Sequence, residues 1–306
     1  MDRKDFLKTV ATAGLAAAMP MVENKDASAR PELPCDLVAV LGGEPDEMFR
    51  RGIAELGGME KFVQKGQTVV IKPNIAWDTA PEWAANTNPI LVAEIVRAAL
   101  EAGAKKVIVF DHTCDEWRKC YEHSGIEKAA KEAGASVIPG NDESAYREVE
   151  LPKAKNLKKA RIHEAILDCD VWINVPILKN HGGAKMSIAM KNLMGIVWDR
   201  QALHRNNLQQ TIADLNTLDK APVLNIVDAY RVMKSNGPRG RSETDNVLSK
   251  ALFLSPDVVA VDTAATKFFN QIEKMTVEEV GHIGAGEELE LGTTKLDTLR
   301  VKRIKP

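Results

Sequence analysis

The stretch that decides the fold runs from residue 171 to residue 195 and reads VWINVPIL (171–178), KNHGGAKMS (179–187) and IAMKNLMG (188–195). The first part has the length and the β-branched content of a buried strand. Lys179 and His181 follow at the carboxyl end of that strand, which is where open α/β sheets place their ligands. The stretch therefore predicts a sheet of buried strands with a functional site beside it.

Glycines and polar side chains occur together directly after this strand. Gly182 and Gly183 free the backbone to approach a ligand. Ser187 is the expected N-cap of a helix within 186–194, and helix N-termini attract anions. The alternative is a surface turn with solvated lysines. We favour a site, because glycines and a titratable cluster at a strand end are typical of one.

Apolar runs alternate with helical patterns along most of the chain. Strands are expected over 37–41, 68–72, 106–111, 223–228 and 251–254. Unbroken apolar strands separated by helices predict an α/β fold, with a mainly parallel sheet and helices on both faces. A small hairpin region is expected as an insertion over 141–163, where polar and apolar residues alternate. Ser255 is the expected N-cap of a helix over 257–269, and a further helix is expected over 276–281.

The segment 1–29 has the composition of an export signal peptide. A basic start precedes a short apolar run over 9–22, and small residues at 27–29 suit a cleavage site. The segment resembles a twin-arginine signal whose second arginine is Lys4, and it predicts an exported, periplasmic protein. The alternative is an N-terminal arm on a cytoplasmic protein. The apolar run is too short for a stable membrane anchor, and residues 30–306 are expected to form one α/β domain.

Charge and cysteine usage exclude several classes of function. The 306 residues carry a net charge of −2, which gives no field that favours nucleic acid. The four cysteines include no Cys-x-x-Cys pair, so we expect neither an iron–sulfur cluster nor a zinc knuckle. Cys114 and Cys120 share a loop and either form a disulfide or remain free thiols. The Gly-x-Gly-x-x-Gly, Walker A and Gly-x-Ser-x-Gly motifs are absent from the sequence.

Polar residues recur at the carboxyl ends of the expected strands. In a parallel sheet these ends line one rim, so we expect the side chains to converge there. The residues at this rim are Lys72, Asn74, Asp111, His112, Cys114, Lys179, His181 and Asp228. Singly, each has a structural explanation, such as a turn carboxylate for Asp111. Their shared location is the stronger argument. His204, beside Arg200 and Arg205, is a weaker candidate for substrate contact.

Lys191 lies in an otherwise apolar helical segment and needs a partner, because an unpaired buried charge is costly. Asp262 has the same requirement within the apolar helix around Val258–Ala265. A Lys191–Asp262 ion pair would satisfy both residues. The alternative, which we weigh equally, is that Lys191 faces an anionic ligand.

The ordered series of these motifs resembles the DUF362 family, a domain of unknown function. The resemblance extends over residues 36–272, and its motifs are KPN (72–74), NP (88–89), PILKNH (176–181), MKNLMG (190–195), GPRG (237–240) and SPDVVAVD (255–262). It implies an α/β domain without assigning an activity. Some members carry a ferredoxin-like cluster segment, whose cysteines this chain lacks.

These observations predict an enzyme that acts on a small anionic substrate, a carboxylate or a phosphate. His181, Lys179 and Asp111 are the expected catalytic residues, with His181 as general acid or base. The expected substrate-binding residues are Lys72, Asn74, Lys191, Asn192 and Arg239. A divalent metal is an open possibility, with Asp111, His112 and Asp228 as candidate ligands. The alternatives are a non-catalytic anion-binding protein and a redox protein that uses an external cofactor near Cys114.

Overall fold

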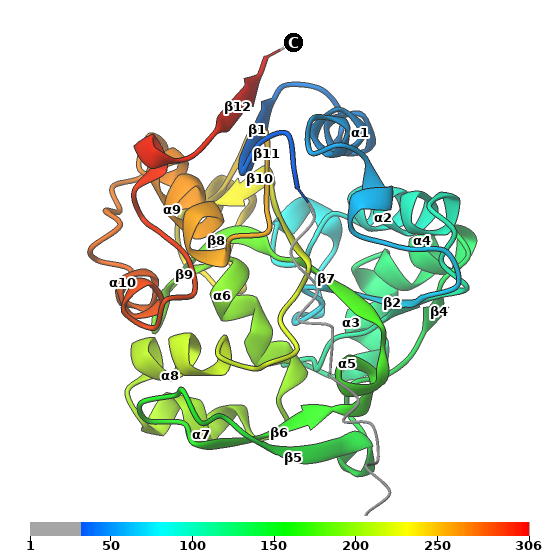
Figure 1. Cartoon of the computed structure of the whole chain (residues 1–306). Coiled ribbons are helices and arrows are strands. Elements are labelled where there is room, and N and C mark those ends of the chain that lie inside the picture. The colour runs from blue at the N-terminus through cyan, green and yellow to red at the C-terminus, as the bar shows by residue number, and fades with distance from the viewer. Residues whose placement is uncertain (1–31, 306) are drawn as a thin grey trace, which may run out of the picture. The chain divides into compact units, whose positions relative to one another are not determined.

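The computed structural model describes residues 32–305 (Figure 1). The predicted export signal at 1–29 lies outside the described residues, so export stays a prediction. Within the described range, no helix is both long and apolar enough to cross a membrane. The strands of the main sheet are β1 (Leu37–Leu41), β2 (Thr68–Pro73), β3 (Lys106–Val109), β4 (Ser136–Val137), β7 (Val171–Val175), β8 (Ile177–His181), β9 (Lys185–Ser187), β10 (Leu224–Met233), β11 (Asn246–Ser255) and β12 (Val301–Ile304).

The chain has the expected α/β fold with a mainly parallel sheet. The strand order is β12-β1-β11-β10-β7-β2-β3-β4, with β8 paired to β10 and β9 paired to β8. Strands β10, β7, β2, β3 and β4 run parallel to one another, whereas β11 is antiparallel to both of its neighbours. The central strands are buried on both faces, as their largely apolar sequences predict.

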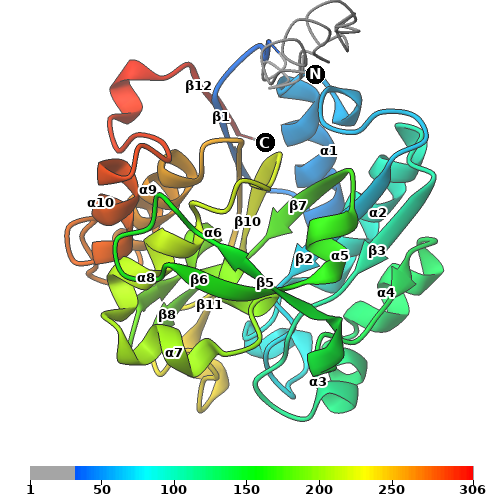
Figure 2. The ribbon, with the colours of Figure 1, turned by 60° about the horizontal axis from the view of Figure 1, so that its bottom comes forward.

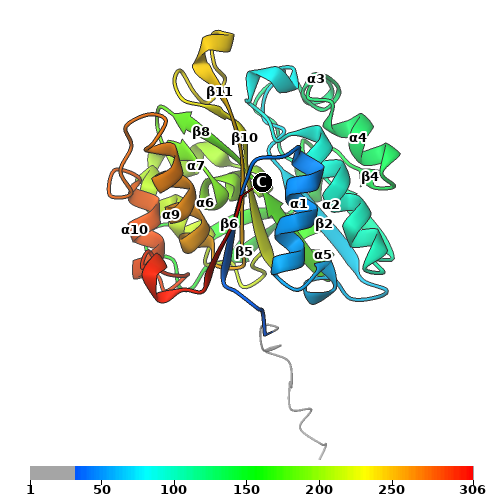
Figure 3. The same ribbon diagram turned by 90° about the horizontal axis from the view of Figure 1, so that it is seen from above.

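Helices cover both faces of this sheet, as Figure 3 shows in a view along its edge. Two separate apolar cores result, one on each face. On one face lie α1 (Pro45–Glu55), α2 (Pro89–Glu101), α3 (Trp117–His123) and α4 (Ile126–Glu132). On the other lie α6 (Ala189–Asn192), α8 (Leu208–Leu215), α9 (Val258–Phe269) and α10 (Gly281–Glu288). The short helices α5 (Glu164–Asp168) and α7 (Arg200–Arg205) pack into the same core as α6, α8, α9 and α10. The 3₁₀ turns are η1 (Met59–Lys61), η2 (Pro81–Trp83), η3 (Glu143–Ala145), η4 (Leu193–Ile196), η5 (Glu243–Asp245) and η6 (Leu296–Thr298).

The inserted hairpin is present and forms a separate sheet. Strands β5 (Tyr146–Glu150) and β6 (Lys159–His163) pair antiparallel, with Tyr146 opposite His163. Figure 2 shows this hairpin crossing in front of the main sheet, beside α7. A single bridge between Ile162 and Val197 ties β6 to the segment that follows η4.

The single strand expected over 171–178 is wrong, because Pro176 divides it into β7 and β8. Proline has no amide hydrogen for the strand ladder. The carbonyl of Pro176 still accepts a hydrogen bond from the Asp228 amide at 2.9 Å. Both strands pair with β10, and β8 continues to His181 before it turns into β9. Lys179 therefore lies within a strand of a tight hairpin.

Three local predictions near helix ends are also wrong. Ser187 belongs to β9, and the N-cap of α6 is Ile188, which supplies no side-chain cap. Ser255 ends β11, and the N-cap of α9 is Asp257, whose carboxylate accepts the amide of Ala260 at 2.8 Å. The helix expected over 276–281 instead begins at Gly281. At α9 both Ser255 and Asp257 could serve as the cap, whereas the N-caps of α6 and α10, Ile188 and Val280, supply no side-chain cap that the sequence could signal.

Candidate functional site

A cavity of about 390 Å³ opens where the carboxyl ends of β2 and β3 meet the β8–β9 hairpin, α6 and α7. Its location is the rim that the strand ends predict. The polar residues that line it are Lys72, Asn74, Asp111, His112, Cys114, Lys179, His181, Ser187, Lys191, Asn192, Arg200, Gln201 and His204. The structure thus brings together most of the predicted site residues. Arg239 and Asp228 do not line this cavity.

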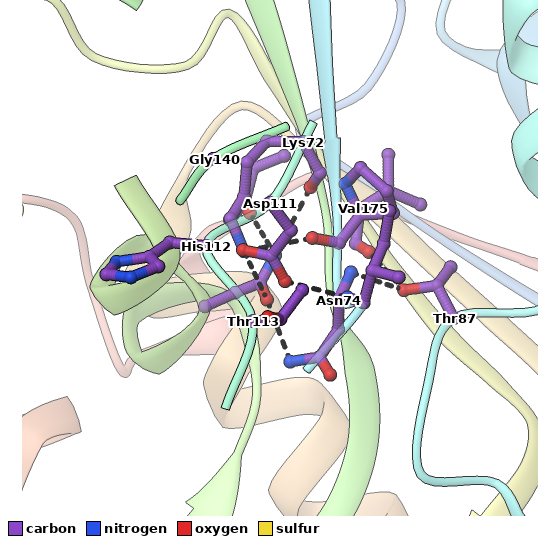
Figure 4. A network of polar contacts seen from close by, with 12 residues as sticks. Lys72, Asn74, Thr87, Asp111, His112, Thr113, Gly140 and Val175 are labelled. Atoms are coloured by element: carbon purple, nitrogen blue, oxygen red, sulfur yellow. Dashed lines mark hydrogen bonds and ion pairs between the residues drawn. The ribbon is translucent and has the colours of Figure 1, made fainter. Parts of the chain in front are cut away.

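Lys72 and Asp111 form a buried ion pair at the floor of the cavity, with Nζ 2.8 Å from Oδ1. Figure 4 shows the two side chains pointing toward one another. The Lys72 ammonium also donates to the Pro73 carbonyl at 2.9 Å and to Asn192 Oδ1 at 3.0 Å. The Lys72 ammonium therefore has two hydrogen-bond acceptors and a carboxylate counter-charge within 3.0 Å. Because these groups already surround the ammonium, Lys72 is less available to a substrate than Lys191, and its expected role in substrate binding stays a prediction.

The side-chain amide of Asn192 has its hydrogen-bonding positions occupied by neighbouring residues. Its Oδ1 accepts from Lys72 and from Asn74 Nδ2, at 3.0 and 3.1 Å. Its Nδ2 donates to the Lys72 carbonyl at 3.2 Å and to Asn174 Oδ1 at 2.8 Å. Asn174 in turn donates to Asn225 Oδ1 at 2.9 Å. Asn192 therefore belongs to a buried polar ladder across the sheet and positions its neighbours. Asn174 and Asn225 are not among the predicted site residues, and their only signal in the sequence is a polar residue inside each apolar strand.

Lys179 projects from β8 and is only 1% exposed. Its Nζ donates to the Ala85 carbonyl and, at 3.4 Å, to Asn74 Oδ1. Burial, followed by the nearby positive charge of Lys191, lowers the pKa of Lys179 from 10.5 to about 7. Within the described part of the chain Lys179 forms no ion pair, in contrast to Lys72.

Lys191 does not pair with Asp262, so the proposed ion pair is wrong. Both oxygens of Asp262 instead accept backbone amides at the start of α6, from Ala189 at 2.7 Å and from Met190 at 2.9 Å. Lys191 points the other way and lines the cavity. Burial, and the charges of Arg200 and Lys72, lower the pKa of Lys191 to about 8. The alternative that Lys191 faces a ligand is the one compatible with this arrangement.

His181 is held as a neutral ring. Its Nδ1 accepts the amides of Gly183 at 3.2 Å and Ala184 at 3.1 Å, so the ring hydrogen lies on Nε2. Burial, and then Lys191 and Lys179, lower the pKa of His181 to about 3. The expected role as general acid or base relies on the ordinary pKa of histidine near neutral pH, so this lowering argues against that role, which stays a prediction. His181 suits the role of a hydrogen-bond donor better than that of a general acid or base at neutral pH.

The three candidate metal ligands do not come together. The carboxylate of Asp228 accepts the amides of Asn88 and Tyr230, at 2.7 and 2.9 Å, away from the cavity. His112 Nδ1 lies 2.9 Å from the Val197 carbonyl, and its ring stacks on Trp198. Figure 4 shows His112 turned away from Asp111. Among residues 32–305, no three His, Cys, Asp or Glu side chains gather as a metal site would require.

Arg239 lies in a different hollow and pairs with Asp115 at 3.5 Å, so it is not part of this cavity. The arginine that does line the cavity is Arg200, which the sequence analysis missed. Its Nη1 donates to the His112 carbonyl at 2.9 Å and to Cys114 Sγ at 3.3 Å. His204, the weaker candidate, lies in the same wall. Cys114 and Cys120 are both free thiols.

The chain belongs to the family described as domain of unknown function DUF362, whose model matches residues 69–267. A thylakoid-associated protein of Synechocystis sp. is 28% identical over 253 residues, which cover 80% of this chain and 75% of the relative. The solved structure of the lactate racemase apoprotein from Thermoanaerobacterium thermosaccharolyticum is 13% identical, with a TM-score of 0.46. That match covers 76% of this chain and 56% of the racemase chain, so this chain spans little more than half of its length.

Proposed function

We propose that this protein is an enzyme that binds a small anion, a carboxylate or a phosphate, in the cavity between β8 and α6. One observation carries the proposal. Lys179 and Lys191 share the cavity, and neither forms an ion pair with a described residue. Lys179 is buried and Lys191 is partly buried. Desolvated cations without counter-charges are costly, and a bound anion would lower that cost.

The charges around the cavity give it an excess of positive charge. The charge of Lys72 is offset by Asp111. Arg200, Lys191 and Lys179 add positive charge without a second cavity-lining carboxylate in the described chain. A charge-assisted hydrogen bond from Lys191 to an anion would contribute about 1.5–3 kcal/mol. Partial exclusion of water from the site would strengthen this attraction further.

Different residues serve different parts of this proposed site. Lys191 is the primary contact for the anion, because its ammonium has no partner in the described chain. His181 offers its Nε2 hydrogen to an oxygen of the same molecule, since Nδ1 is already occupied. Lys72, Asn192 and Asp111 position these groups through the buried network. A non-catalytic anion-binding protein is the second candidate, favoured by the absence of a titrating group at His181.

The test measures ligand binding by thermal shift and by calorimetry. Propionate and inorganic phosphate are the two probes, and each is used separately. We expect at least one probe to raise the melting temperature, because ligand binding stabilises the folded state by mass action. Lys191→Ala should lower affinity for that probe about 10- to 150-fold, which corresponds to about 1.5–3 kcal/mol. Lys153→Ala is the matched control, because Lys153 is exposed and distant from the cavity lining. Equal binding by Lys191→Ala and wild type would contradict the proposed site.

A further inference from the structure

We propose that Lys179 is a nucleophile that forms an imine with the carbonyl carbon of a 2-oxo acid held in this cavity, an inference that rests on the proposed function. The two ends of such a substrate match the two kinds of group in the site. Its carboxylate requires a cation, and its carbonyl carbon requires an amine with a free electron pair.

The hydrogen bonds of Lys179 fit a neutral amine. A neutral amine has two hydrogens and one lone pair, and Lys179 has two acceptors, the Ala85 carbonyl and Asn74 Oδ1. Both hydrogens are then satisfied, and the lone pair is left for the cavity that Lys179 lines. Lys72 provides the internal comparison. It has two hydrogen-bond acceptors and also a counter-charge, the Asp111 carboxylate at 2.8 Å, which Lys179 lacks within the described chain.

The surroundings of Lys179 favour the same state. Its side chain is buried, and Lys191 adds a like charge nearby. Desolvation and a neighbouring cation are the two devices that activate lysine amines in enzymes. Together they lower the pKa of Lys179 to about 7, so that about half of the amine is neutral at pH 7.

Neighbouring residues suit the remaining parts of a 2-oxo acid. Lys191 lines the same cavity and supplies the cation for the carboxylate. His181, with its hydrogen fixed on Nε2, is a donor for the carbonyl oxygen. A neutral imidazole that polarises a carbonyl is a known electrophilic role for histidine.

The step balances without an oxidant or reductant. The lone pair of Lys179 Nζ attacks the carbonyl carbon, and a C–N bond forms as the C=O π bond opens onto oxygen. The nitrogen loses a proton, and the oxygen gains one, to give a carbinolamine. A second proton on that oxygen lets it leave as water, and the nitrogen lone pair forms the C=N bond. The product is a protonated imine, which withdraws electrons from the adjacent carbons.

Reductive trapping tests this proposal. The intact protein is incubated separately with pyruvate, 2-oxobutyrate and 2-oxoglutarate in the presence of sodium cyanoborohydride, and analysed by intact mass and peptide mapping. We expect one adduct per chain, on Lys179. Labelling there should exceed that of any exposed lysine by about 100-fold or more, because the neutral fraction at pH 7 follows the pKa. Lys179→Arg should lose the adduct, and Lys153→Ala should keep it.

Propionate separates the two proposals, because it has the carboxylate but no carbonyl. If propionate raises the melting temperature while none of the three 2-oxo acids labels Lys179, the imine is ruled out and the anion site stands. If neither propionate nor inorganic phosphate has an effect and no label is found, both proposals fail. Labels spread evenly over exposed lysines would also overturn the imine. This mapping is made on the wild-type protein, so it does not depend on the folding of Lys179→Arg.

Discussion

Lys72 Nζ lies 2.8 Å from Asp111 Oδ1, and both side chains are almost fully buried. Lys72 comes from β2, whereas Asp111 follows the neighbouring strand β3. Asp111 also accepts the Ile75 amide at 2.7 Å, and Lys72 also donates to Asn192 at the end of α6. The pair thus joins two strand ends to the helix that carries Lys191, which makes it a structural support for the cavity.

The first prediction concerns this pair. Lys72→Met should destabilise the protein by about 3–5 kcal/mol, because it leaves the Asp111 carboxylate buried without its counter-charge. Chemical denaturation with the linear extrapolation method measures the loss. The double variant Lys72→Met/Asp111→Leu should recover part of it, since no charge is then left unpaired. A loss below about 0.5 kcal/mol, the range of ordinary surface changes, would show that the pair is not a support.

The second prediction concerns Gly195, which gives this pair its space. A Cβ at Gly195 would lie 1.9 Å from Asp111 Oδ1 and 2.5 Å from Lys72 Nζ, closer than atoms can approach. Gly195→Ala should therefore cost about 1–3 kcal/mol or more through overpacking. Gly284→Ala is the matched control, because a Cβ at that exposed position in α10 meets no atom within 4 Å. Equal stability of Gly195→Ala and Gly284→Ala, measured by thermal unfolding, would be incompatible with this packing.

The sequence predicts where the site lies better than what each residue does there. Parallel strands end at one rim, so polar residues after the apolar runs are expected to meet, and Lys72, Asp111 and Lys179 do line one cavity. Asp228 does not, because β10 continues past it to Met233. The alternation of strands and helices likewise predicts the fold class. The main wrong boundary is the single strand expected over 171–178. The sequence around Pro176 does not tell whether this proline ends a strand or lies within one, and in the structure it separates β7 from β8.

The roles depend on contacts between residues far apart in the sequence. Whether Lys72 is free to bind a ligand depends on Asn192, which is 120 residues away. Asp262 contacts the amide of Ala189 across 73 residues, so no local pattern separates that contact from an ion pair with Lys191. The protonation of His181 depends on the turn that follows it, because that turn directs the amides of Gly183 and Ala184 at the Nδ1 atom of the ring. Spacing along the chain carries none of this information.

The third prediction concerns Asp262, which holds the start of α6. Asp262→Ala would leave the amides of Ala189 and Met190 buried without acceptors. Each unsatisfied donor costs about 1–3 kcal/mol, so the loss should exceed that of a surface change several-fold. Lys191→Ala should in contrast cause no loss of unfolding free energy, because it removes a charge that has no partner in the described chain. Denaturant unfolding of the two variants measures both changes in the free energy of unfolding. Comparable destabilisation by both would restore the idea that Lys191 and Asp262 depend on one another.

The fourth prediction is that anion affinity falls as pH rises. The pKa values of Lys179 and Lys191 are lowered from 10.5 to about 7 and about 8, so both are charged below those values and neutral above them. An anion binds the charged form, so affinity is greatest below about pH 7 and declines toward about pH 9. His181 stays neutral throughout this window, because its pKa is lowered to about 3. The expected decline is about tenfold or more for each ammonium that becomes neutral, because its hydrogen bond to the anion is then no longer charge-assisted.

Calorimetric titration with propionate from about pH 6 to about pH 9 measures this decline, because a carboxylate with an ordinary pKa near 4 keeps its charge over the whole range. Lys191→Ala should bind more weakly at low pH and lack the part of the decline centred near pH 8, because that ammonium is gone. Lys153→Ala, an exposed control, should follow the wild-type curve. Imine trapping at Lys179 should change in the opposite direction, rising through about pH 7, since the neutral amine is the nucleophile. An affinity that is constant or increases over this range would mean that these two lysines do not bind the anion.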